Sequence, residues 1–319
     1  MTAATALLIM VAIDGQVVNK TTGQPAAGVE ITLIQAGQGG MKPVAAVKSG
    51  ADGRFDLPAR EAAAGTVSLL QANYQGVTYN RMLPPNAPSQ GLEVGVFDTT
   101  ADTAAAQVGQ HMMVIEHVPG ELRVNETIML QNASQRTLAN PKGTLRFFLP
   151  PAAGGKVRVS AASGQQGMPL NRVAMKTAEP NVYAVDFLVK PGETRFDITW
   201  TAPFATPGEL QGRILHKDGK TNLIVPKGMS LKGDKLQELG LEPRTQASIY
   251  GVGFGSFNAT VEGAGTLRNP AADTEEEGGG GTPVDVIPPK IYDRVYWVLG
   301  FAFSILGIAF YRLYRRPAV

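Results

Sequence analysis

Residues 195–200 read Arg-Phe-Asp-Ile-Thr-Trp, with apolar side chains at Phe196, Ile198 and Trp200 and polar side chains between them. In a β-strand, every second side chain points to the same face. One face of this segment, including Trp200, is therefore expected to enter a core, while the other face meets water. The pattern favours a β-fold for this part of the chain.

The same two-residue spacing recurs upstream of this strand. Pro191-Gly192 predicts a tight turn before it, and three further alternating runs lie at residues 122–130, 145–149 and 183–189. We predict that residues 108–203 form an immunoglobulin-like β-sandwich.

Downstream, residues 210–268 continue the strand pattern. Lys217-Asp218-Gly219-Lys220 predicts a hairpin, and strand candidates follow at residues 223–225, 247–250 and 257–261. Residues 234–239 (DKLQEL) carry the one hint of a short helix. This region either completes the second sandwich or forms a small third domain, and the sequence leaves both alternatives open.

Residues 13–98 show a strand–turn–strand pattern of their own. Thr22-Gly23-Gln24-Pro25 predicts a turn, and alternating apolar residues follow it at 28–34. A second turn is predicted at Asp52-Gly53, just before Phe55. Residues 66–73 and 92–97 are further strand candidates.

Two stretches of this region carry a family resemblance. GQVVNKTTGQPAAGVEITL (15–33) and ADGRFDL (51–57) resemble carboxypeptidase regulatory-like domains, also described as prealbumin- or transthyretin-like. The resemblance covers residues 13–98 and implies a β-sandwich used as an accessory, adhesive or carbohydrate-binding-like module. No segment resembles the zinc peptidase catalytic domain, so no peptidase activity is implied. The whole layout also resembles anchored membrane proteins of bacteria such as the acidobacteria.

Composition excludes many enzyme classes. The 319 residues include no cysteine and three histidines, which removes disulfides, thiolate metal sites and cysteine nucleophiles. No G-x-S-x-G, H-E-x-x-H or Walker motif is present. No Lys/Arg stripe suited to nucleic acid appears either. The sequence therefore predicts a protein that is not an enzyme, has no cofactor and binds no nucleic acid.

The C-terminal part of the chain has the pattern of a membrane anchor. Residues 269–290, an acidic Gly/Pro-rich run, are expected to be a solvated linker. Residues 291–314 follow as a predicted transmembrane helix with aromatic residues at both ends, and residues 315–319 as a cytoplasmic tail. The predicted anchor and interface residues are Tyr292, Tyr296, Trp297, Tyr311, Arg312, Tyr314, Arg315 and Arg316.

Charge supports this orientation. The net charge of +2 divides into +3 for residues 291–319, with four arginines against one aspartate, and −1 for residues 1–290. Because arginines follow the apolar run, the positive-inside rule places the C-terminus in the cytoplasm and the body outside, in the periplasm of a bacterium. The N-terminal residues 1–12 are either a secretory signal segment or part of the first strand.

One cluster has the residue types of a metal site. On a strand, His111, Met113, Ile115 and His117 would share a face and offer copper ligands. The two histidines, however, lie about 20 Å apart along an extended strand. We therefore expect a half-exposed strand face, expect His216 at the surface, and interpret the glycines of residues 251–255 as a loop or bulge.

These patterns lead to one functional expectation. We predict a non-enzymatic, single-pass protein of the bacterial inner membrane that binds or scaffolds protein partners, as an accessory subunit of a larger complex. The alternative is a cell-surface carbohydrate-binding or adhesion module, favoured if Tyr74, Tyr79 and Trp200 form an exposed aromatic platform. The expected partners are the lipid bilayer, proteins of the membrane or periplasm and, in the alternative, a glycan.

Overall fold

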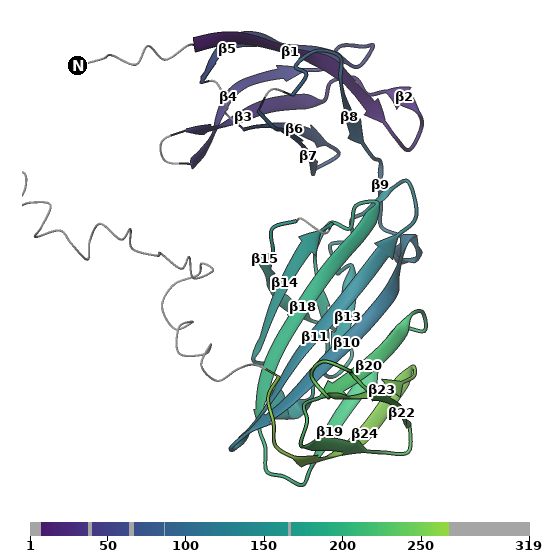
Figure 1. The fold of residues 1–319 in the computed structure, drawn as a ribbon. Helices are drawn as coiled ribbons and strands as arrows, with labels where there is room; N and C mark the ends of the chain where they lie inside the picture. Colours follow the sequence, from purple (N-terminus) through teal and green to yellow (C-terminus); the bar gives the residue numbers. More distant parts are fainter. Residues whose placement is uncertain (1–7, 38–39, 64–66, 86, 165–166, 268–319) are drawn as a thin grey trace, which may run out of the picture. The chain divides into compact units, whose positions relative to one another are not determined.

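The computed structural model describes residues 8–37, 40–63, 67–85, 87–164 and 167–267 (Figure 1). Within these ranges the chain consists mainly of β-strands, as the sequence predicts. Helical structure there is limited to two 3-10 turns, η1 (Thr103–Ala105) and η2 (Pro151–Ala153).

The first part of the chain contains two four-stranded sheets. In one sheet β1 lies between β2 and β5 and also pairs in parallel with β8, and the other has the order β4-β3-β6-β7. The strands of the first sheet are β1 (Leu8–Asn19), β2 (Gln24–Pro25), β5 (Arg54–Ala63) and β8 (Leu92–Val96). Those of the second are β3 (Glu30–Gly37), β4 (Gly40–Lys48), β6 (Ser68–Tyr74) and β7 (Val77–Leu83).

These two sheets enclose one hydrophobic core. Val17 and Leu57 from one sheet are buried in the same cluster as Leu33 and Leu70 from the other. The arrangement follows from the alternation in each strand, since β6 buries every second residue over its first five positions. Strand β1 begins at Leu8. Residues 8–12, for which the sequence left open a signal segment or the first strand, therefore belong to this sheet.

The second part is built on an eight-stranded sheet of order β15-β14-β18-β11-β10-β20-β23-β22. The sheet is antiparallel except between β10 and β20, which run parallel. Its strands are β10 (Ala106–Val118), β11 (Glu121–Asn132), β14 (Val157–Ser163), β15 (Leu170–Arg172), β18 (Gly192–Pro203), β20 (Lys220–Val225), β22 (Leu236–Leu241) and β23 (Ser248–Val252).

Two three-stranded sheets pack against the large one and share its core. Their orders are β13-β17-β16 and β19-β24-β21. Phe147 of the first, Ala259 of the second and Ile198 of the large sheet belong to one buried cluster. The strands are β13 (Leu145–Phe148), β16 (Ala174–Lys176), β17 (Val182–Val185), β19 (Gly208–Ile214), β21 (Met229–Lys232) and β24 (Gly255–Gly263).

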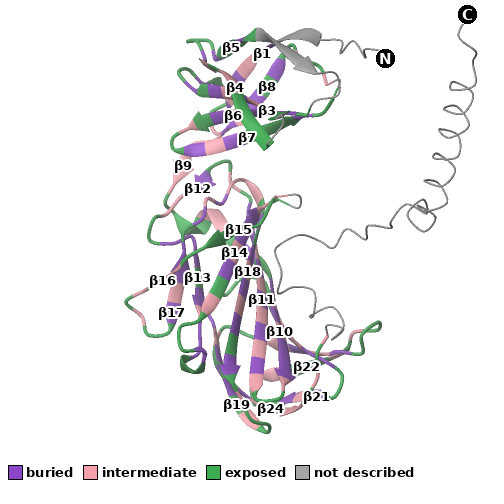
Figure 2. Cartoon of the chain, turned by 90° about the vertical axis from the view of Figure 1, so that its left-hand side faces the viewer, coloured by how far each residue is buried: buried purple, intermediate pink, exposed green. Residues whose placement is uncertain are grey.

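Alternation explains why the long strands occupy the centre of the large sheet. In β11 every second residue from Leu122 to Leu130 is buried, and β18 buries Phe196, Ile198 and Trp200 on one face (Figure 2). The neighbouring positions remain partly exposed, so each strand covers the core on one side and meets solvent on the other.

The structure corrects two sequence-based expectations in this part. Residues 236–241 form the edge strand β22 rather than a helix, because pairing with β23 satisfies backbone groups that a helix this short leaves open. The turn at residues 217–220 is not a hairpin, because β19 pairs with β24 whereas β20 pairs with β10 and β23. The turn instead carries the chain from one sheet to another.

Hydrogen bonds join the two cores. Short strands β9 (Thr99–Thr100) and β12 (Thr137–Leu138) pair in parallel beside the first core. The hydroxyl of Tyr79, whose ring lies in the first core, is 2.8 Å from the buried hydroxyl of Thr137 and donates to the carbonyl of Phe97. Nearby, Lys190 Nζ donates to the carbonyl of Thr78 at 2.5 Å.

Candidate functional site

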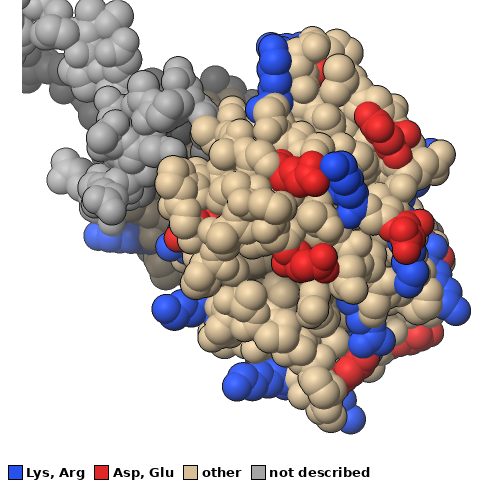
Figure 3. Space-filling view, turned by 90° about the horizontal axis from the view of Figure 1, so that it is seen from below, with Lys and Arg blue, Asp and Glu red and all other residues tan. Residues whose placement is uncertain are grey.

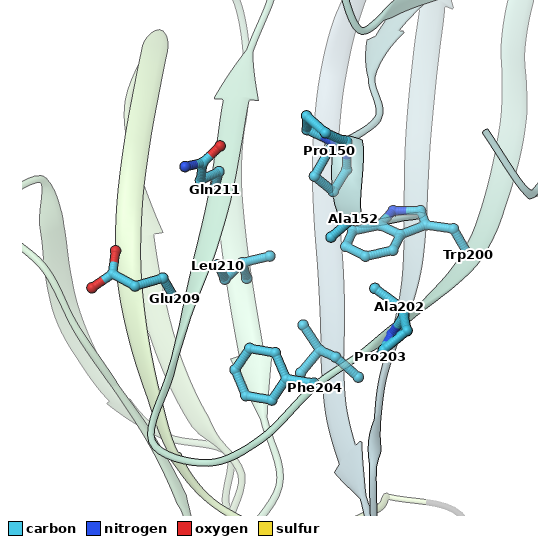
Figure 4. Close-up of a pocket in the computed structure, with 11 residues that line it drawn as sticks. Pro150, Ala152, Trp200, Ala202, Pro203, Phe204, Glu209, Leu210 and Gln211 are labelled. Carbon is cyan, nitrogen blue, oxygen red and sulfur yellow. The ribbon is translucent and has the colours of Figure 1, made fainter. Parts of the chain in front are cut away.

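A groove of about 310 Å³ opens at one end of the second core (Figure 4). Trp200 and Ala202 of β18 form one wall, with Pro150 and Ala152 beside them, and Leu210 of β19 lies on the opposite side. With Leu122 of β11 at the same wall, the lining is largely apolar and comes from four separate segments of the chain. We call it the Trp200 groove.

The Trp200 groove lies between two sheet edges. Strand β19 pairs with β24 on one side, and no other described strand pairs with its other side. Strand β13 is likewise an edge, and Pro150–Ala152 follow it after one residue, Leu149. An edge strand presents free backbone N–H and C=O groups to which another chain can pair.

Glu179 joins these two edges beyond the groove. Its carboxylate accepts hydrogen bonds from Arg146 of β13 and Arg213 of β19, each at 2.5 Å. The two hydrogen bonds hold the pKa of Glu179 below its ordinary value. The edges are therefore held together at Glu179, while they stay apart at the groove.

The lining of the Trp200 groove suits an apolar ligand. Glu209 is the one titratable side chain among the lining residues, and Figure 4 shows it pointing away from Trp200. The indole Nε1–H of Trp200 is buried and has no hydrogen-bond partner among the described residues. The apolar walls of the groove can hold an apolar side chain.

A second candidate is a buried polar cluster on the large sheet. His111 of β10 places Nδ1 2.9 Å from Nε2 of His216, which lies in the turn between β19 and β20. The other ring nitrogen of His111, Nε2, is 2.7 Å from Glu126 Oε1 of β11, in an ion-pair contact outside hydrogen-bond geometry. The Nδ1–H of His216 donates to the carbonyl of Asp218 at 2.6 Å.

The sheet register explains why these residues meet. His111 lies opposite Thr221 in the parallel β10–β20 pair and diagonally across from Glu126 in the β10–β11 pair. His111 and Glu126 are buried, at 3% and 4% exposure, and His216 is half-buried. Burial lowers the pKa of His216, with the hydrogen bond to Asp218 acting in the opposite direction.

This cluster corrects the expectation for the strand face of His111 and His117, which is buried rather than half-exposed. His216 is partly exposed and also contacts His111. Sequence reasoning missed Glu126 and Thr221. Glu126 had a signal, because it occupies an inward position between Val124 and Ile128 of an alternating strand.

His117 takes part in a different set of contacts, at the end of the described chain. Its Nδ1 lies 2.8 Å from the carbonyl of Gly263, and its own carbonyl accepts a hydrogen bond from the N–H of Gly265. The neighbouring buried Glu116 accepts hydrogen bonds from the backbone N–H of Leu267 and the hydroxyl of Thr266. We call these contacts the C-terminal clamp.

The predicted anchor residues lie outside the described residues. These are Tyr292, Tyr296, Trp297, Tyr311, Arg312, Tyr314, Arg315 and Arg316. In the part of the chain that is described, no helix has the length and apolar character needed to cross a membrane. The same part brings no three His, Cys, Asp or Glu side chains together as a metal site.

The aromatic platform of the carbohydrate-binding alternative is absent. Tyr79 and Trp200 are buried, at 5% and 3% exposure, in separate cores, while Tyr74 is partly buried. Of the glycines at residues 251–255, Gly253 lies between β23 and β24, whereas Gly251 is in β23 and Gly255 begins β24. In the face shown in Figure 3, acidic and basic side chains are interspersed rather than gathered into a basic stripe.

Comparison with known proteins gives little. No family model matches the chain, and no curated protein matches it. Similar solved structures include an M1 zinc metallopeptidase from Deinococcus radiodurans (9% identity, 49% of this chain, 42% of that chain, TM-score 0.27) and native yeast LTA4 hydrolase (7%, 53%, 31%, TM-score 0.34). The chain spans less than half the length of either protein, and at these TM-scores the likeness carries no argument.

Proposed function

We propose that this protein is a non-enzymatic, single-pass membrane protein that binds a protein partner on the outer side of the bacterial inner membrane, as an accessory subunit. The pattern of the anchor at residues 291–314 and the arginines after it support the orientation. The Trp200 groove beside the free edge of β19 supports the binding role, and it is the observation on which the proposal rests.

The finer fold assignments belong to the same proposal. We assign residues 13–98 to the carboxypeptidase regulatory-like class, supported by their sequence and by two sheets around one core. We assign residues 108–203 an immunoglobulin-like sandwich character, extended by the strands of residues 208–263, which share its core. Residues 108–203 with the strands of residues 208–263 then carry the Trp200 groove, and residues 13–98 act as an accessory module.

We propose an extended protein segment as the occupant of the groove. Such a segment pairs with the free edge of β19 and places an apolar side chain in the cavity against Trp200. Leu210 faces inward on β19, whereas Glu209 and Gln211 face outward, so a partner strand would present alternating apolar and polar residues. A basic residue opposite Glu209 would then form a favourable cross-strand pair.

A peptide-display selection tests this proposal. The full chain in detergent micelles is panned against a random peptide library, and the enriched peptides are measured against variants. Ala152→Trp fills the groove from an exposed position and is expected to weaken binding about tenfold or more. Ala133→Trp, at an exposed position between β11 and β12, is the matched control and is expected to leave binding unchanged.

Hydrogen exchange supplies the second readout. Peptide binding is expected to slow amide exchange in β19, because edge N–H groups acquire partners. Peptides that bind Ala152→Trp as well as the unmodified chain, without protecting β19, would refute the proposal. Groove-independent binding of glycans in place of peptides would favour the carbohydrate-binding alternative.

A further inference from the structure

Nδ1 of His111 and Nε2 of His216 face each other in the buried polar cluster. The outer nitrogen of His216 donates to the carbonyl of Asp218, and that of His111 lies 2.7 Å from Glu126 Oε1, outside hydrogen-bond geometry. A carbonyl oxygen only accepts hydrogen bonds, so Nδ1 of His216 carries its proton and leaves a lone pair on Nε2. Nδ1 of His111 either donates a hydrogen bond to that lone pair or, where the His111 proton sits on Nε2 beside the Glu126 carboxylate, faces it with a lone pair of its own.

Where the His111 proton sits on Nε2, both facing nitrogens, 2.9 Å apart, can bind a cation. The hydroxyl of Thr221 lies 3.4 Å from each of them. This is also the outer arrangement of metal-binding histidines, whose second ring nitrogen is held by a carboxylate or a backbone carbonyl.

The turn that carries His216 is fixed against β10. Gly219 has φ +73°, and a Cβ there would lie 2.4 Å from the carbonyl oxygen of Val108. Only glycine permits this close approach, which brings His216 over His111. The geometry is thus set by the backbone rather than by a flexible surface loop.

We propose that His111 and His216, with Thr221 beside them, bind a single Zn²⁺ or Cu²⁺ ion. Imidazole nitrogens suit both ions. Tetrahedral zinc with Zn–N distances of about 2.0–2.1 Å needs its two nitrogens about 3.3 Å apart, so the rings open by about 0.4 Å from their present separation. Water fills the remaining positions, reached from the half-buried side of His216. This site is independent of the Trp200 groove.

Metal titration of the full chain tests the proposal, using Zn²⁺ and Cu²⁺ separately and a purification tag without histidine. His111, His117 and His216 are the only histidines of the chain, so three variants cover every imidazole. His216→Gln is expected to weaken binding more than tenfold and Glu126→Gln about 10–100-fold. His117→Gln removes a buried histidine of the C-terminal clamp and is expected to retain the affinity.

X-ray absorption of the loaded, unmodified protein needs no variant. Two nitrogen ligands at about 2.0–2.1 Å are expected for zinc. One-to-one binding that His216→Gln abolishes, in a variant still folded by circular dichroism, would support the site. Absence of saturable binding, or equal binding by His216→Gln, would overturn it and leave a proton as the cation between the rings.

Discussion

At the scale of single residues, a substitution at Gly219 measures how much the fixed turn at residues 217–220 contributes to stability. Gly219→Ala is expected to lower the free energy of unfolding by about 2–4 kcal/mol, because the new methyl group meets the Val108 carbonyl and φ is positive. Urea denaturation measures the change.

The matched control is Gly120→Ala, in the turn between β10 and β11. Gly120 also has positive φ, at +83°, but a Cβ there meets nothing within 4 Å. Gly120→Ala is therefore expected to lower the free energy of unfolding by about 1 kcal/mol, the cost of a positive φ for a residue that has a Cβ. Equal losses for the two variants would show that contact with Val108 does not hold the turn.

At the scale of elements, Glu179 predicts a pH dependence for the joined edges of β13 and β19. Its folded-state pKa lies below the unfolded value of 4.5. Its stabilisation is therefore fully present above that value and is lost as pH falls through the folded pKa. The melting temperature of the unmodified chain should exceed that of Glu179→Gln at neutral pH, and the gap should close in acid as the pH falls through the folded-state pKa.

Glu238→Gln serves as the control for this pH series. Glu238 is exposed on β22. The unmodified chain and this variant should melt alike throughout the series, because exposed side chains away from specific contacts have small effects. A gap for Glu179→Gln that persists in acid would show that its effect is not electrostatic.

The elements also show what sequence patterns can and cannot predict. Strands with one buried and one solvent-exposed face, such as β11 and β18, were predictable, because such a strand needs apolar and polar residues in alternation. Strand β22 was not, because its conformation depends on pairing with β23 rather than on its own residues. The Trp200 groove escaped prediction for the same reason, since its walls come from separate sheets.

The histidine cluster illustrates the same limit at longer range. His111 and His216 are 105 residues apart in sequence, and they meet because β20 pairs in parallel with β10. Alternation predicted that His111 and His117 share a face and could have flagged Glu126, but it did not predict that this face is buried, and no local pattern encodes a parallel partner. The sequence therefore supported a mainly β-fold, and the site depended on topology.

At the scale of the whole molecule, the hydroxyls of Tyr79 and Thr137 test whether the two cores are coupled. A double-mutant cycle with Tyr79→Phe and Thr137→Val should give a coupling free energy of about 1 kcal/mol, because their hydrogen bond is buried. Urea unfolding of the four proteins measures it. Strictly additive losses would mean that this contact contributes nothing to the junction.

The C-terminal clamp has a mechanical consequence. A force that pulls on Leu267 acts on β10 before it acts on β24, because Glu116 and His117 hold residues 263–267 to β10. Strand β10 lies inside the eight-stranded sheet, between β11 and β20. A force applied at Leu267 is therefore distributed over the central strands. The sheet is expected to resist this force as a unit rather than to lose strands one by one from its edge.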